Sequence, residues 1–257
     1  MKQRPSFPAS LIANSLLDTA QTKRALVNAR APTASSHGMD SNAVRMRMVA
    51  RLRTQGTSDP SVLRAMGLVE RHRFVDSALV NQGYEDTSLP IGLGQTISKP
   101  SVVARMLELL RQGAQLKEGR LGRVLEIGTG CGYQAAVLSH LASEVYSIER
   151  LRGLHEKARD NLRHLALAKV HLLLGDGMQG YAKGAPYAAI IAAAGGDALP
   201  QAWIDQLGVG GRLIAPVSNM SAGRGQQALV VVDKTAAGIV HTILEAVHFV
   251  PLKSGIA

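Results

Sequence analysis

The sequence predicts an α/β fold in which a doubly wound, mostly parallel sheet has an antiparallel end. An apolar strand at 123–127 precedes a glycine-rich turn, an apolar helix and a strand that ends at Glu149, which is the order of a βαβ unit. Further apolar strands follow at 170–174 and 187–194. The last strands, which begin near residue 210, are closely spaced, and this spacing favours antiparallel pairing.

Two helices are predicted at the start of the domain. Apolar residues recur at helical spacing among arginines over 41–56, which indicates an amphipathic helix with a basic outer face that ends at Gly56. We expect that face to be solvated, with an acidic partner as the alternative. The next helix has Pro60 in its first turn, and Ser58 or Asp59 is expected to cap it.

Residues 71–100 are predicted to form an ordered loop that precedes the βαβ unit. Pro90 and Gly94 exclude a long helix here but allow a short strand. Ser98, or the lysine that follows it, is expected to cap a helix that begins at Pro100 and ends at a glycine. A loop of this length is a candidate lid or substrate platform.

The glycine-rich turn predicts a bound nucleotide cofactor. An acid and three glycines form the pattern E-x-G-x-G-x-G over 126–132, and glycines let the backbone approach a ligand closely. Glu149, at the end of the next strand, is placed to reach ribose hydroxyls. Because the carboxylate of Glu126 repels phosphates and attracts an ammonium group, the pattern favours S-adenosyl-L-methionine over NAD. A tight turn without a ligand is the alternative interpretation.

The third strand of the predicted sheet ends at Gly175-Asp176-Gly177. The carboxyl ends of parallel strands meet at one edge of a sheet, and ligands bind there. We therefore expect Asp176 to lie on the same edge as Gly128 and Glu149.

Composition and charge limit the classes of function. The net charge of +10 is concentrated in residues 1–53, which contain nine basic and two acidic residues. Residues 54–257 have a net charge of only +3. This part has no strong polyanion signature, so no nucleic acid is expected as a partner. No apolar run approaches the ~20 residues that cross a bilayer, so no membrane is expected either. The scattered histidines predict no metal site.

Cys131 is the single cysteine, which excludes an internal disulfide framework and suits a reducing, cytoplasmic compartment. We expect it to be a small buried residue rather than a catalytic thiol. Residues 1–40 are expected to be a basic, flexible N-terminal extension, with a targeting segment as the alternative. Residues 41–257 are expected to form one domain, with helices and the substrate loop at 41–113 and the cofactor-binding sheet at 120–257.

Several motifs then occur in one order and spacing: LPIGLGQTIS, VLEIGTGCGYQAAVL, VYSIER, GDG, QL-x-x-GGRLIAPV and HFVPL. Over residues 44–253 this series resembles the protein-L-isoaspartate O-methyltransferase family, enzymes that repair aged aspartyl and asparaginyl residues. The resemblance implies a Rossmann-like, S-adenosyl-L-methionine-dependent enzyme that methylates the α-carboxylate of L-isoaspartyl residues in damaged proteins and peptides. The ester then cyclises to a succinimide, whose hydrolysis restores some aspartate. The resemblance also implies isoaspartyl proteins as partners, and we expect a cytoplasmic monomer.

The resemblance assigns the active-site serine to Ser98, the last residue of QTIS. It implies cofactor contacts for eight residues: Glu126, Gly128, Thr129, Gly130, Glu149, Asp176, Gly177 and Gln227. Because a carboxylate is already ionised at pH 7, methyl transfer to it needs no strong general base. Ser98 is instead expected to orient the carboxylate through a hydrogen bond.

The chain departs from the family pattern at four positions. Cys131 replaces a serine, Glu70 a proline, Ala188 an acid and Ala193 a threonine. The two alanines are expected to remove polar groups near the functional edge of the sheet. Two alternatives to repair therefore stay open: a methyltransferase acting on RNA or a small molecule, suggested by the basic N-terminal region, and a non-catalytic binding protein that kept the fold.

Overall fold

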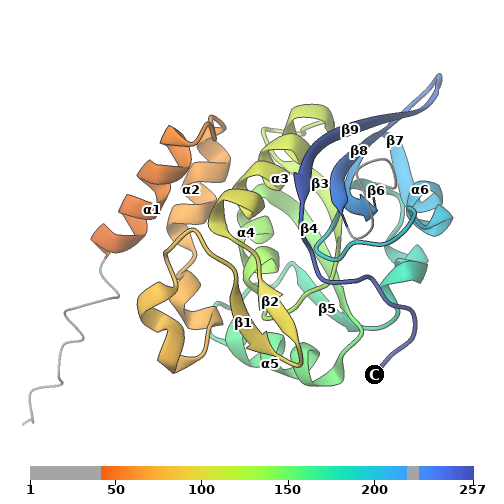
Figure 1. Ribbon diagram of the computed structural model, residues 1–257. Helices are drawn as coiled ribbons and strands as arrows, with labels where there is room; N and C mark the ends of the chain where they lie inside the picture. The colour runs from red at the N-terminus through yellow and green to blue at the C-terminus, as the bar shows by residue number, and fades with distance from the viewer. Residues whose placement is uncertain (1–41, 219–225) are drawn as a thin grey trace, which may run out of the picture. The chain divides into compact units, whose positions relative to one another are not determined.

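The computed structural model describes residues 42–218 and 226–257, which belong to one compact unit. The expected extension at 1–40 lies outside the described residues. A seven-stranded sheet has the order β5-β4-β3-β6-β7-β8-β9 (Figure 1). Its strands are β3 (Leu121–Ile127), β4 (Ala142–Glu149), β5 (Val170–Leu174), β6 (Tyr187–Ala192), β7 (Leu207–Ser218), β8 (Gln227–Thr235) and β9 (Gly238–Val247).

Strand directions confirm the predicted mostly parallel sheet. The four pairings among β3, β4, β5, β6 and β7 are parallel, whereas β8 is antiparallel to both β7 and β9. In the register of β3 and β4, Glu126 lies opposite Ser147 and Ile127 opposite Ile148. The chain of β4 therefore reaches Glu149 beside the glycine-rich turn that leaves β3.

Helices cover both faces of the sheet, as a parallel sheet requires. They are α1 (Asn42–Thr54), α2 (Pro60–Leu68), α3 (Pro100–Gly113), α4 (Tyr133–Leu141), α5 (Arg152–Arg163), α6 (Gln201–Gln206) and the short helices η1 (Arg71–Phe74), η2 (Ser77–Gln82), η3 (Gly177–Gln179) and η4 (Ala182–Gly184). Buried residues of α1 to α5 share one core with Val124 of β3, and Trp203 of α6 shares another with Leu125. No helix in the described ranges is long and apolar enough to span a membrane.

The predicted start of α2 is confirmed in detail. Asp59 Oδ1 accepts hydrogen bonds from the backbone N–H groups of Ser61, at 2.7 Å, and Val62, at 3.1 Å. Glu108 of α3 supports the same turn from inside. Its side chain is buried, and Oε1 accepts from the backbone N–H groups of Ser58, at 2.7 Å, and Asp59, at 2.8 Å, and from the Ser58 hydroxyl, at 2.9 Å.

The loop before α3 contains a β-hairpin, made of β1 (Leu89–Gly92) and β2 (Gln95–Ile97), where the sequence predicted one short strand. Its turn has positive φ at Gly92, Leu93 and Gly94 (98°, 52° and 69°). The two glycines adopt such angles at little cost. The hairpin is a separate sheet, so contacts with helices must hold it in place.

The cap of α3 differs from the prediction. Lys99 is the residue at the cap position, but neither it nor Ser98 supplies a side-chain cap. Instead, Asp86 Oδ1 accepts a hydrogen bond from the Ser101 backbone N–H, at 2.9 Å. The capping group therefore comes from the preceding loop, which leaves the Ser98 hydroxyl available for another partner.

We expect Glu108→Ala to lower the free energy of unfolding by about 2 kcal/mol, because it leaves two part-buried N–H donors without their acceptor. Urea denaturation would measure this loss. Glu156→Ala, which truncates an exposed glutamate on α5, should change stability little. Equal effects of the two substitutions would contradict a supporting role for Glu108.

Candidate active site

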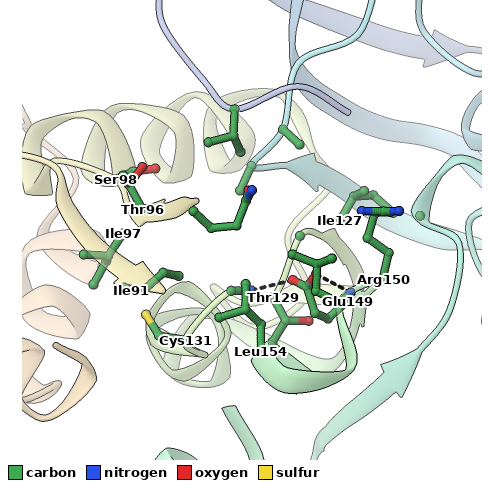
Figure 2. Close-up of a pocket in the computed structure, with 18 of the residues that line it drawn as sticks. Ile91, Thr96, Ile97, Ser98, Ile127, Thr129, Cys131, Glu149, Arg150 and Leu154 are labelled. Carbon is green, nitrogen blue, oxygen red and sulfur yellow. Dashed lines mark hydrogen bonds between the residues drawn. The ribbon is translucent and has the colours of Figure 1, made fainter. Parts of the chain in front are cut away.

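A cavity of about 450 Å³ lies at the carboxyl ends of the parallel strands. Most of its lining comes from three parts of the chain: the glycine-rich turn with the end of β4, the β1–β2 hairpin with Ser98, and the C-terminal segment 250–253. Single residues of α3, α5 and η3 and the two alanines after β6 also contribute. Figure 2 shows Thr96 and Ser98 on one side of this space and Glu149 and Arg150 on the other. The structure thus brings the predicted acceptor-side serine and the predicted ribose-binding acid to one cavity.

The glycine-rich turn forms the floor of the cavity with its backbone. Gly128, Gly130 and Gly132 have φ of 89°, 57° and 90°, a conformation that L side chains rarely adopt. A Cβ on Gly130 would also lie 3.2 Å from Cδ1 of Ile91 in the hairpin. A Cβ on Gly177 would lie 2.6 Å from Cγ2 of Ile127. Only glycine therefore leaves the floor at these two points open to a ligand.

Glu149 fixes the shape of this turn. Its Oε2 accepts a hydrogen bond from the Gly130 backbone N–H, at 2.9 Å, and its Oε1 accepts one from the Leu151 N–H, at 2.9 Å. The residue is only 5% exposed, yet it lines the cavity. Because each carboxylate oxygen can accept more than one hydrogen bond, Glu149 can also accept from two adjacent ligand hydroxyls.

Glu126 lies beneath the floor rather than in the cavity. It is fully buried, its Oε2 accepts from the Ser147 hydroxyl, and the Ser147 and Thr129 hydroxyl oxygens are 2.7 Å apart. Burial raises the pKa of Glu126 to about 8, an effect that hydrogen bonding from Ser147 and Gln134 only partly offsets. The acid is therefore protonated at pH 7. The sequence predicted a charged Glu126 that attracts an ammonium group, whereas the structure places its carboxyl against Ser147 beneath the turn. A contact of Glu126 with the cofactor stays a prediction.

Ser98 meets the geometric requirement for an acceptor-side residue. It follows β2 directly, is half-buried and lines the cavity. Within the described part of the chain, its hydroxyl has no hydrogen-bond partner. A free hydroxyl on a cavity wall can donate a hydrogen bond to a bound carboxylate.

The remaining predicted cofactor residues divide into two groups. Gly177 and Thr129 line the cavity. Asp176 does not, and its carboxylate accepts from the Met178 N–H, at 2.9 Å, and the Gly255 N–H, at 2.8 Å. Gln227 also lies outside the lining, and its contact with the cofactor stays a prediction.

Gln227 instead holds the segment that closes the cavity. Its Oε1 accepts from the Phe249 N–H, at 2.7 Å, and its Nε2 donates to the Phe249 carbonyl, at 3.3 Å. The next residues, 250–253, line the cavity, and Val250 and Leu252 bond to the backbone of Gly195. Sequence reasoning missed this wall, although the motif HFVPL marks its start.

The departures from the family pattern lie in different places. Ala193 lines the cavity as expected. Ala188 does not lie near the functional edge, which corrects the prediction: it contacts Gly122 at the opposite end of the sheet. Glu70 forms ion pairs with Arg45, at 3.5 Å, and Arg73, at 2.8 Å.

Cys131 is buried, as predicted, although it lines the cavity. Burial raises the pKa of its thiol to about 11. A thiol with so high a pKa stays protonated at neutral pH, and only the thiolate is a strong nucleophile.

The pKa of Glu126 gives stability a pH dependence. The folded state keeps the proton up to about pH 8, whereas an unfolded glutamate loses it near 4.5. The contribution of Glu126 is therefore fully present below pH 4.5 and is lost as pH rises towards 8. The stability of the unmodified protein relative to Glu126→Gln should fall over this range by up to about 1.4 kcal/mol per pH unit.

Urea denaturation of both proteins between pH 5 and 8 would measure that difference. Glu156→Gln, an exposed change, should give a difference that does not vary with pH. A constant difference for Glu126→Gln would show that this acid is ionised in the folded state.

Comparisons with known proteins agree with this architecture. The model of the family described as protein-L-isoaspartate(D-aspartate) O-methyltransferase matches residues 43–257. The protein-L-isoaspartate O-methyltransferase of Leptothrix cholodnii is 58% identical over 98% of this chain and 84% of its own length. That of Methylibium petroleiphilum is 60% identical over 88% of this chain and 83% of its own length.

Solved structures show the same fold. A protein-L-isoaspartate O-methyltransferase that is 30% identical has a TM-score of 0.72 and covers 83% of this chain and 67% of its own. A putative protein-L-isoaspartate O-methyltransferase from Plasmodium falciparum, in complex with S-adenosyl-L-homocysteine, is 23% identical with a TM-score of 0.67 and covers 81% of this chain and 98% of its own. The family match gives no support to an RNA or small-molecule acceptor. The chain belongs to the protein-L-isoaspartate O-methyltransferase family.

Proposed function

We propose that the cavity is the active site in which this protein-L-isoaspartate O-methyltransferase binds S-adenosyl-L-methionine and the isoaspartyl carboxylate on opposite walls. The enzyme repairs damaged proteins by methylating L-isoaspartyl residues. One observation supports the assignment above all: the free hydroxyl of Ser98 lines the same cavity as the glycine-rich turn and Glu149. Acceptor-side and donor-side groups therefore share one enclosed space.

The residues present fit the cofactor. Gly128 and Gly130 present backbone without side chains, and Gly177 leaves the floor open. Glu149 keeps acceptor capacity for ribose hydroxyls after bonding two backbone N–H groups. Thr129 and Gly177 line the space around it. The binding of S-adenosyl-L-homocysteine by the Plasmodium falciparum protein is consistent with this placement.

Glu126, Asp176 and Gln227 act indirectly in this proposal. Glu126 supports the turn through Ser147 and Thr129. Asp176 and Gln227 hold the C-terminal segment, through Gly255 and Phe249 respectively. Their loss should weaken cofactor binding by loosening the walls of the cavity.

Methyl transfer to a carboxylate depends more on the orientation of the carboxylate than on acid–base catalysis. The bound cofactor supplies an electrophilic methyl group. The acceptor carboxylate is ionised at neutral pH, so no residue needs to remove a proton from it. The Ser98 hydroxyl donates a hydrogen bond that points one carboxylate oxygen along the line of transfer. The largely apolar hairpin and the C-terminal segment exclude water from that line.

We also infer a cytoplasmic monomer whose catalytic unit is residues 41–257 and whose partners are isoaspartyl proteins and peptides rather than nucleic acids or membranes. The single cysteine suits a reducing compartment. The modest net charge beyond residue 53 gives little attraction to polyanions.

The purified protein should transfer methyl groups to an isoaspartyl peptide and leave the aspartyl peptide of the same sequence unlabelled. The two peptides differ in where the carboxylate is attached, so only a site that orients the α-carboxylate separates them. A radiolabelled methyl-transfer assay measures both. Equal labelling of the two peptides, or of neither, would refute the proposed function.

Ser98→Ala should lower kcat by about tenfold to a hundredfold, because the carboxylate loses its orienting hydrogen bond. The Kd for S-adenosyl-L-homocysteine, measured by calorimetry, should change little. Ser139→Ala, which removes a hydroxyl bonded to the backbone of α4, is the control and should leave kcat unaltered. A Ser98→Ala enzyme with normal kcat would remove Ser98 from the mechanism.

A further inference from the structure

Arg71 of η1 is a buried cation with few partners. Its side chain is completely inaccessible to solvent. Nη2 makes a long hydrogen bond of 3.4 Å to the Thr87 carbonyl, whereas Nε and Nη1 have no hydrogen-bond partner among the described residues. Burial lowers its pKa, but arginine stays charged in proteins. A buried charge without a carboxylate partner is costly, so its presence needs an explanation.

One contact of Arg71 is with the donor side of the active site. The guanidinium carbon lies 4.9 Å from the centroid of the Tyr133 ring, within the range of a cation–π interaction. Tyr133 is the first residue of α4 and follows Gly132 directly. It also lines the cavity and is 1% exposed. Arg71 therefore packs against the residue at which the glycine-rich turn becomes a helix.

The other contact is with the acceptor side. Thr87, whose carbonyl accepts from Arg71, lies two residues before β1. Its neighbour Asp86 caps α3 through the Ser101 N–H and contributes electrostatically to the pKa of Arg71. Ser98 lies between that hairpin and the capped helix. Arg71 thus contacts the segment before the hairpin, through Thr87. It also lies near Asp86, which caps the helix that follows Ser98.

We propose that Arg71 is a positioning residue for methyl transfer. It holds the acceptor wall, which is the β1–β2 hairpin with Ser98, at a fixed distance from the donor wall, which is the glycine-rich turn with Glu149. This role rests on the proposed function of the cavity. The hairpin belongs to a separate sheet, so the main sheet does not fix its distance from the glycine-rich turn. In-line transfer depends on that distance, and a displacement of about 1 Å can cost a hundredfold in rate. The planar guanidinium contacts both the Tyr133 ring and the Thr87 carbonyl.

Arg71→Met tests the role, because it keeps an unbranched apolar chain and removes the planar cation. Arg71→Lys keeps the charge and removes the plane. Arg111→Met is the matched control: Arg111 is also buried, but it pairs with Asp59, at 2.8 Å, and the Gly119 carbonyl, at 3.0 Å, away from the cavity. All proteins are compared in the full chain at a temperature where each is folded.

For Arg71→Met we expect kcat for an isoaspartyl peptide to fall by about tenfold to a hundredfold. The Kd for S-adenosyl-L-homocysteine should rise by a smaller factor than kcat falls, because the turn becomes looser but Glu149 and the glycines that bind the cofactor are kept. Hydrogen exchange of the ligand-free protein should become faster both in 84–98 and in 128–134. Arg71→Lys should recover part of kcat. Arg111→Met should lower stability and speed exchange near 57–63, with kcat unchanged.

Normal kcat in folded Arg71→Met would overturn the proposal, as would an equal loss of kcat in Arg111→Met. Faster exchange in only one of the two segments would show that Arg71 supports that wall alone and does not set the two together. If the unmodified enzyme fails to methylate isoaspartyl peptides, the proposed function fails, and hydrogen exchange still decides whether Arg71 connects the two segments.

Discussion

The site depends on the carboxylate of Glu149. Three of the five residues of the turn are glycines, so few side chains hold it and its shape depends largely on the hydrogen bonds of its backbone N–H groups. The N–H groups of Gly128 and Thr129 bond to the carbonyl of Ile148, at 2.9 and 3.2 Å, and that of Gly130 bonds to Glu149 Oε2, at 2.9 Å. Both acceptors lie at the end of β4. The parallel pairing of β3 with β4 therefore places the turn, and the acid that holds the turn also lines the cavity.

The acceptor wall, the β1–β2 hairpin, contacts the glycine-rich turn directly. Ile91 of the hairpin lies over Gly130, and its carbonyl accepts a hydrogen bond from Lys157 of α5, at 2.9 Å. Lys157 also pairs with Asp76 at 2.8 Å. Because α5 follows Glu149 in the chain, the element after the donor-side acid also holds the hairpin.

The sequence was sufficient for features that depend on neighbours in the chain. Periodicity and turn residues predicted the helices and strands. The rule for carboxyl ends of parallel strands predicted that Asp176 shares an edge with Gly128 and Glu149, and the residue after Asp176, Gly177, lines the cavity. The sequence was insufficient for features that depend on contacts between segments far apart in the chain. The cap of α3 comes from Asp86, and the segment at 250–253 closes the cavity. The neutral state of Glu126 follows from complete burial, which no local pattern specifies.

That neutral state determines the charge presented to the substrates. With Glu126 protonated beneath the floor, Glu149 is the only acid among the described residues that line the cavity, and Arg150 and Lys253 are the only basic residues among them. The lining is therefore weakly positive and attracts the acceptor, an anionic carboxylate. An ionised Glu126 would cancel this excess. The burial of Glu126 thus has two consequences. Its hydrogen bond with Ser147 supports the turn, and its neutral state leaves the cavity favourable to a carboxylate.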